Sequence, residues 1–163
     1  MGRYAVLLDR IGPPIVLRRS QLVCIHFTTP TCRPGKVKAM IDIEGAAPAF
    51  KTDTFSANCY TCQTYNGVPS TLTPLWGVTN APITYSPEIT APVSQLVCVP
   101  DIAPAGPNLG TWWLRGRRCI KLPNLNGIPI MIMVAQSSFA AQTEICMHRF
   151  LLQAGVKNDL VHL

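Results

Sequence analysis

The sequence predicts an α/β fold built on a mostly parallel β-sheet with crossover helices. Three observations indicate this fold class. Short apolar runs alternate along the chain with segments of helical spacing. The runs are almost continuously apolar, which is typical of parallel strands that are buried on both faces. The chain has 163 residues, 48% of them hydrophobic, which is enough for the core of one ordinary domain. We therefore expect strands joined by helices that cross over the sheet.

The amino-terminal part of the chain predicts one helix and two strands. Arg3–Gly12 places apolar side chains near helical spacing, and its final glycine is a natural helix stop before two prolines. Pro14–Leu17 is wholly apolar and predicts a short buried strand. Lys38–Ile43 predicts a second strand, which carries one aspartate, Asp42, in its interior.

The carboxyl-terminal part predicts a strand, a helix and a last strand. Ile128–Ala135 is the clearest buried strand in the chain, and Ala140–Gly155 has helical spacing and a terminal glycine. Leu160–Leu163 predicts the beginning of another strand. About four strands form an incomplete sheet, so we expect exposed strand edges through which the chain self-associates.

The distribution of prolines predicts how the single domain, residues 1–163, is organised. The chain contains 15 prolines, roughly twice the average usage of about 5%, and most of them lie between Pro48 and Pro129. We expect a core formed by residues 1–50 and 120–163. A Pro-rich, cap-like insertion is expected over residues 51–119.

Charge and hydropathy argue against a nucleic-acid partner and against a membrane span. The net charge of +6 is spread over several places instead of forming one basic patch, so nucleic acid is not the expected partner. The segment Trp112–Lys121 is the nearest candidate for such a patch, and a solvated basic loop is its alternative reading. The longest apolar run is far shorter than the roughly 18 residues needed for a membrane span. The amino end also lacks the apolar centre of a signal peptide, so the compartment is left open.

The seven cysteines do not predict a metal site. Their odd number argues against a fully paired disulfide framework. Cys59 and Cys62 have CxxC spacing, but no second such pair follows to complete a zinc site. A local disulfide or two free thiols is the favoured interpretation, and we predict no metal and no cofactor.

Polar residues follow the predicted strands, where ligands of parallel sheets bind. Ser20-Gln21 follows the first strand, Glu44 the second, and Gln136-Ser137-Ser138 the third. A serine and a carboxylate at one sheet edge suggest a hydrolase site. A glutamate that merely caps or solvates its turn is the alternative for Glu44.

Several segments resemble a known family when they are taken in order. They are "LLDRIGPPIVL", "RPGKVKAMIDIEGAAPAF", "PLWGVTNAPITYSPEI", "KLPNLNGIPIMIMVAQSS" and "FLLQAGVKNDLVHL". Together with Ser20-Gln21 they resemble the carboxyl-terminal half of proteins in the esterase branch of the α/β-hydrolase superfamily. In that branch the nucleophile elbow reads His-Ser-Gln-Ser-Gly and the triad acid is a glutamate. The resemblance implies a partial α/β-hydrolase fold with a lid-like insertion.

The resemblance also implies roles for particular residues. Ser20 would be the nucleophile that forms an acyl-serine intermediate, and the backbone N–H of Gln21 would serve the oxyanion hole. Glu44 would orient the catalytic histidine. Trp76 and Tyr85, with the tandem tryptophans at 112 and 113, would line a pocket for a small ester substrate.

The chain departs from the family pattern in three places. No glycine flanks Ser20, although the strained elbow needs small neighbours. Leu22–Cys32 matches the family nowhere, which suggests a shifted reading frame or altered splicing. The histidines at 26, 148 and 162 are not in the expected loop, so we expect a fragment of an ester hydrolase that is inactive as this chain. A non-catalytic binding or structural domain that uses residues 112–121 is the alternative.

Overall fold

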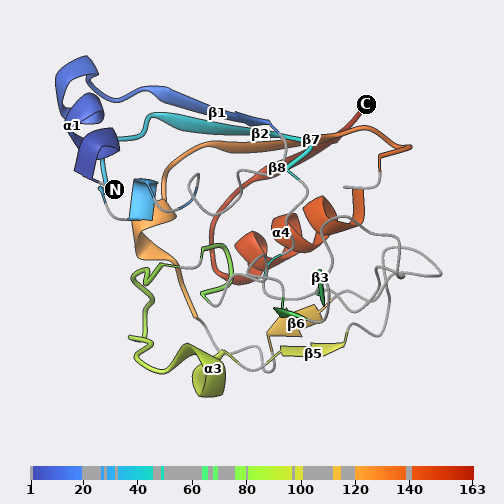
Figure 1. Ribbon diagram of the computed structural model, residues 1–163. Coiled ribbons are helices and arrows are strands. Elements are labelled where there is room, and N and C mark those ends of the chain that lie inside the picture. Colours follow the sequence, from blue (N-terminus) through green and yellow to red (C-terminus); the bar gives the residue numbers. More distant parts are fainter. Residues whose placement is uncertain are drawn as a thin grey trace.

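A four-stranded parallel sheet lies along one side of the computed structural model, with α4 and the shorter elements on one of its faces (Figure 1). The structure describes residues 2–19, 27, 29–31, 33–45, 49, 64–65, 68–69, 76–79, 81–96, 98–100, 112–114, 120–138 and 141–163. The sheet has the order β1-β2-β7-β8, and each neighbouring pair is parallel. Its strands are β1 (Ile15–Arg19), β2 (Ala39–Ile43), β7 (Ile130–Val134) and β8 (Asp159–His162). The predicted α/β fold class is confirmed.

Two helices occupy the positions that the sequence predicts. Helix α1 (Gly2–Ile11) precedes β1, and α4 (Ala141–Gln153) connects β7 to β8 as a crossover helix. Gly155 ends the last turn of α4 with φ of 75°, a backbone conformation that glycine adopts without the steric cost of a Cβ atom. The amide of Val156 then donates to the carbonyl of Leu151 at 2.8 Å, which satisfies a carbonyl at the end of the helix.

Shorter elements lie between β2 and β7. Two antiparallel pairs form there, β3 (Thr64–Tyr65) with β4 (Val68–Pro69) and β5 (Cys98–Pro100) with β6 (Trp112–Leu114). A one-turn helix, α3 (Pro92–Gln95), and a 3₁₀ turn, η1 (Pro123–Leu125), complete the described elements. The described residues of this Pro-rich region thus form short ladders and turns.

The main sheet is covered on one face. Helix α4 lies along that face (Figure 1), where Met147, Phe150 and Leu151 join the same core cluster as Met40 and Ile132. On the opposite face the side chains are less covered: Ile41 and Met131 are half-buried, and Leu17 is 62% exposed. Parallel strands are ordinarily buried on both faces, so this second face is unusually open for its apolar composition.

The described part of the Pro-rich segment shares the core of the sheet. Val78, Ile83 and Tyr85 belong to the cluster that contains Leu122 and Phe150. The backbones of Ser86 and Lys121 exchange two hydrogen bonds of 3.0 and 2.8 Å, which attach the segment to the chain leading into β7. The cap-like role of this insertion stays a prediction.

Within the residues that the structure describes, none of the helices combines the length and the apolar character required to cross a membrane.

The open face leads to a prediction about self-association. Ile15 and Leu17 of the edge strand β1 are both more than half exposed, and large apolar patches of this kind promote association. We expect the full chain to associate in a concentration-dependent way, and Leu17→Lys to weaken that association at least several-fold in sedimentation velocity. Leu152→Lys, at an exposed apolar position on α4, is the matched control. Equal association of both variants and the unmodified chain would contradict the prediction.

Candidate functional site

The carboxyl ends of the four parallel strands lie along one edge of the sheet. In the strand register Arg19 is beside Ile43, Ile43 beside Met133, and Met133 beside Val161. Neighbouring strands are about 4.8 Å apart, so the residues that follow these positions begin close together. This edge is where the sequence places its hydrolase site.

Glu44 begins the turn after β2 in an unusual backbone conformation. It has φ of 53°, the left-handed region that residues other than glycine rarely adopt. Its N–H donates to the carbonyl of Met133 at 3.0 Å, which extends the pairing of β2 with β7 by one residue. A conformation of this kind costs roughly 1–2 kcal/mol in a residue with a Cβ atom, so surrounding contacts must maintain it.

The carboxylate of Glu44 binds the turn that follows β7. The amide of Ala135 donates to Oε1 at 2.7 Å, and the hydroxyl of Ser138 donates to Oε2. The side chain is half-buried and reaches across to the neighbouring strand end instead of capping its own turn. Both contacts fix the direction of the carboxylate at the sheet edge.

A buried ion pair lies directly beneath this turn. Arg18 and Asp42 are register neighbours on β1 and β2, and their side chains are 3% and 0% exposed. Nε of Arg18 donates to Oδ1 of Asp42 at 2.7 Å, and Nη2 donates to Oδ2, so the guanidinium grips the carboxylate with both ends of its fork. Oε1 of Glu144, on α4, lies 3.8 Å from Nη2.

Burial raises the pKa of Asp42 above its ordinary value, because the low-dielectric interior penalises the charged carboxylate. The positive charge of Arg18 and its hydrogen bonds act against this rise in the pKa. The aspartate inside an apolar strand was the one sign of this cluster in the sequence. Nothing in the local patterns of Arg18 or Glu144 indicated that these side chains would be buried with it.

Gly45 closes the turn against the guanidinium. A Cβ atom built on Gly45 would overlap Nη2 of Arg18 and Oδ1 of Asp42, and would lie 2.6 Å from Cζ of Arg18. Separations below 3.0 Å essentially never occur for real Cβ atoms. Glycine is therefore required after Glu44 because the ion pair occupies the space of a side chain.

Several predicted site residues lie outside the described part of the chain. Ser20 and Gln21 are among them, and the backbone is described up to Arg19, the residue that precedes Ser20. The segment Leu22–Cys32, which does not match the family pattern, is described at residues 27 and 29–31, and these residues are helical. Cys59 and Cys62 also lie outside, whereas Cys146 is buried on α4.

Two of the three histidines are described. Nδ1 of His148 lies 2.7 Å from Oδ1 of Asn158, a contact that holds the ring on the side of α4. His162 is exposed at the end of β8, where it pairs in register with Val134. Val134 precedes Ala135, whose amide binds Glu44. Of these two histidines, only His162 is thus linked to the Glu44 edge through the strand register.

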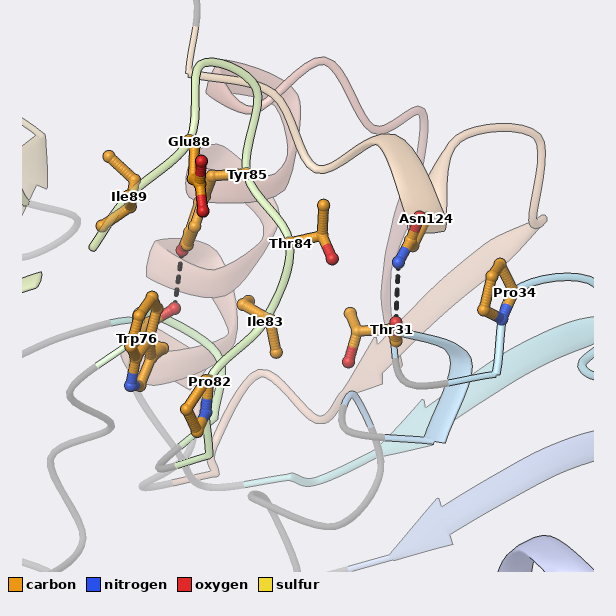
Figure 2. A pocket seen from close by; sticks show the side chains of 10 residues that line it. All are labelled: Thr31, Pro34, Trp76, Pro82, Ile83, Thr84, Tyr85, Glu88, Ile89 and Asn124. Atoms are coloured by element: carbon orange, nitrogen blue, oxygen red, sulfur yellow. Dashed lines mark hydrogen bonds between the residues drawn. The ribbon is translucent and has the colours of Figure 1, made fainter.

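Trp76 and Tyr85, two of the predicted pocket residues, line one hollow of about 720 Å³ (Figure 2). The hydroxyl of Tyr85 donates to the carbonyl of Trp76 at 2.6 Å, which ties the two sides of this wall together. The other lining residues are Thr31, Pro34, Pro82, Ile83, Thr84, Glu88, Ile89 and Asn124.

The hollow lies toward the opposite end of the sheet from Glu44. Pro34 and Asn124, which line it, precede β2 and β7 in the chain, whereas Glu44 follows β2. Five residues of strand span about 16 Å, so the structure does not bring the pocket residues to the Glu44 edge. Their role as walls of an ester pocket stays a prediction.

The candidate partner-binding segment, residues 112–121, is described only in part. Trp112–Leu114 forms β6, and residues 115–119 lie outside the part of the chain that the structure describes. Among the described residues, no group of three or more His, Cys, Asp or Glu side chains could hold a metal ion.

Comparison with known proteins gives one relative. The chain is 32% identical over 161 residues to "Probable secreted lipase phiG" from Fungal sp. (strain ATCC 74256). The alignment covers 98% of this chain and 40% of the relative, so the chain spans less than half of the relative's length. No family model matches the chain, and no solved structure matches it.

The buried pair leads to a prediction about stability. Asp42→Ala would leave the Arg18 guanidinium buried without its carboxylate, which typically costs about 3–5 kcal/mol. Chemical denaturation should report a loss of that size in the free energy of unfolding. Arg19→Ala, at the exposed neighbouring position, is the control and should change it by less than about 0.5 kcal/mol. A similar small loss for both variants would show that the pair does not form.

The backbone of Glu44 leads to a second stability prediction. Glu44→Ala and Glu44→Gly lose the same carboxylate contacts, but only alanine keeps a Cβ atom in the left-handed conformation. We expect the glycine variant to be more stable by about 1 kcal/mol, the reverse of the usual order of these residues. Urea titration of both variants measures the difference. An alanine variant as stable as the glycine variant would argue against this conformation.

Proposed function

We propose that the chain is part of a carboxyl-ester hydrolase that acts through an acyl-serine intermediate. The observation that carries the proposal is the similarity to a probable lipase over almost the whole chain, which indicates an ester hydrolase at the level of class. The parallel sheet and the carboxylate held at its carboxyl edge support the same reaction. Ligands of open parallel sheets bind at this edge.

In the proposed reaction Ser20 is the nucleophile. Its hydroxyl oxygen attacks the ester carbonyl carbon while a histidine takes its proton, and the backbone N–H of Gln21 donates to the oxyanion that forms. The tetrahedral intermediate collapses, the alcohol leaves with the proton, and water then hydrolyses the acyl-serine by the same steps. Arg19 and Ile43 are register neighbours, which favours a short distance between the residues that follow them, Ser20 and Glu44.

Glu44 is the proposed acid of the triad. A triad carboxylate fixes the tautomer of the histidine and stabilises its positive form. Each carboxylate oxygen can accept more than one hydrogen bond, so the contacts of Glu44 with Ala135 and Ser138 leave it able to accept from an imidazole. Those contacts would hold the carboxylate still while the imidazole changes charge.

The general base is the weakest part of the proposed triad in this chain. The ring of His148 is held by Asn158, and His162 sits at the end of an edge strand. We therefore propose that the chain by itself has little or no turnover of esters. A base supplied from outside would then restore the reactivity of Ser20, because proton removal contributes about 10²–10⁴-fold to such reactions.

Chemical rescue tests this proposal. The full chain is treated with a fluorophosphonate probe with and without added imidazole, and the labelled residue is found by mass spectrometry. We expect slow labelling of Ser20 that imidazole accelerates by at least about tenfold, and none in Ser20→Ala. Ser137→Ala, at an exposed serine on the same sheet edge, is the control and should leave labelling unchanged. No labelling of Ser20 with imidazole present would refute the proposed nucleophile.

A further inference from the structure

We propose that Arg18 is a positioning residue for Glu44, which it holds at the sheet edge by supporting Gly45 from beneath. The guanidinium is fixed by Asp42 and fills the space where a side chain at position 45 would lie. The proposal deepens the proposed function and rests on it in one respect, because it takes Glu44 as the triad acid. The claim about the conformation of Glu44 can be tested without any activity.

The first step of the argument is the contact between Gly45 and the ion pair. Gly45 is buried, and the atoms nearest to its missing Cβ all belong to Arg18 and Asp42. The chain leaving β2 therefore passes directly over the guanidinium. A shift of the guanidinium would remove the surface on which this part of the turn packs.

The second step is the strain at Glu44. A glutamate keeps a positive φ only where its surroundings over-determine it. On one side, the carboxylate is tied to Ala135 and Ser138. On the other side, Gly45 is fixed against Arg18. Removing either restraint should allow the turn to relax and the carboxylate to leave the amide of Ala135.

The third step is the position of the pair in the sheet. Arg18 lies two residues before Ser20 and Asp42 two residues before Glu44, and the two are register neighbours. The ion pair thus joins the strand ends that lead to both proposed catalytic residues. The side chain of Glu144 brings α4 to within 3.8 Å of the same guanidinium, so three elements meet there.

Stability alone does not account for charges at this depth. Replacing a buried ion pair by apolar residues of similar volume is often neutral or stabilising. In some proteins a buried pair of this kind fixes one geometry, and the geometry proposed here is that of the Glu44 turn. The bidentate fork of arginine defines both the distance and the plane of its partner, which a lysine would not do.

Hydrogen exchange of the Ala135 amide tests the proposal directly, because that amide donates to Glu44. A variant without the charges combines Arg18→Met, Asp42→Leu and Glu144→Gln. We expect its Ala135 amide to exchange roughly tenfold faster or more, while the Leu163 amide, which donates to Val134, keeps its protection. Arg19→Met on the exposed side of β1 is the matched control and should change neither amide. Unchanged protection of Ala135 in the charge-free variant would overturn the proposal.

A second variant covers the case in which the charge-free variant does not fold. Gly45→Ala keeps all three charges but places a methyl group where the guanidinium lies. We expect the same loss of protection at Ala135, because the methyl group overlaps Nη2 of Arg18 and Oδ1 of Asp42 and the turn cannot keep its place over the ion pair. If the Ala135 amide exchanges as slowly in Gly45→Ala as in the unmodified chain, the proposal is also overturned.

The imidazole-rescued labelling separates a positioning role from a merely structural one. If Arg18 acts through Glu44, Gly45→Ala should raise the imidazole concentration that gives half-maximal labelling of Ser20. It should also remove most of the acceleration by imidazole, because the reaction depends on the position of the groups involved. An unmodified chain that is not labelled refutes the proposed function, and Ala135 exchange still decides the positioning claim. If Gly45→Ala is labelled as fast as the unmodified chain, the position of Glu44 does not affect the reaction of Ser20. That result would refute the proposed role of Arg18 in catalysis.

Discussion

The buried contact between Arg18 and Asp42 is the constraint on which the carboxyl edge of the sheet depends. It joins β1 to β2 by a side-chain pair where their backbones are already neighbours, and it lies out of contact with water. Its presence explains the glycine at position 45, and that glycine together with the β7 turn explains why Glu44 accepts an unfavourable backbone conformation. Three residues of the "DIEG" stretch, Asp42, Glu44 and Gly45, are thus held by contacts with residues distant in the chain.

The sequence predicted the regular part of the fold well because its signals are local. The helix that ends at Gly12, the strand with Asp42 and the helix that ends at Gly155 were recognisable from apolar spacing and stop residues, and the structure confirms them within one or two residues at most ends. The parallel order followed from the alternation of helices and strands. These features need no knowledge of distant contacts.

The site was less predictable because it depends on contacts between residues far apart in the chain. Glu44 was placed correctly at a strand end, but its partners Ala135 and Ser138 are more than 90 residues away. Arg18 is flanked by another arginine and gave no sign of burial, whereas Arg19 beside it is exposed. Trp76 and Tyr85 line one hollow, with Pro34 and Asn124 from the chain before β2 and β7, and no local pattern indicated where along the sheet that hollow would lie. Burial and strand direction, which decide these points, are not local properties.

The carboxyl edge of the sheet depends on one contact, in which Arg18 is locked to Asp42 beneath the Glu44 turn. NMR exchange of the Arg18 Nε–H proton tests it most directly, with the exposed Arg19 in the same chain as the reference. The Arg18 proton should exchange much more slowly than that of Arg19, and Asp42→Asn should accelerate its exchange. Equal exchange of the two arginine protons in the unmodified chain would contradict the account.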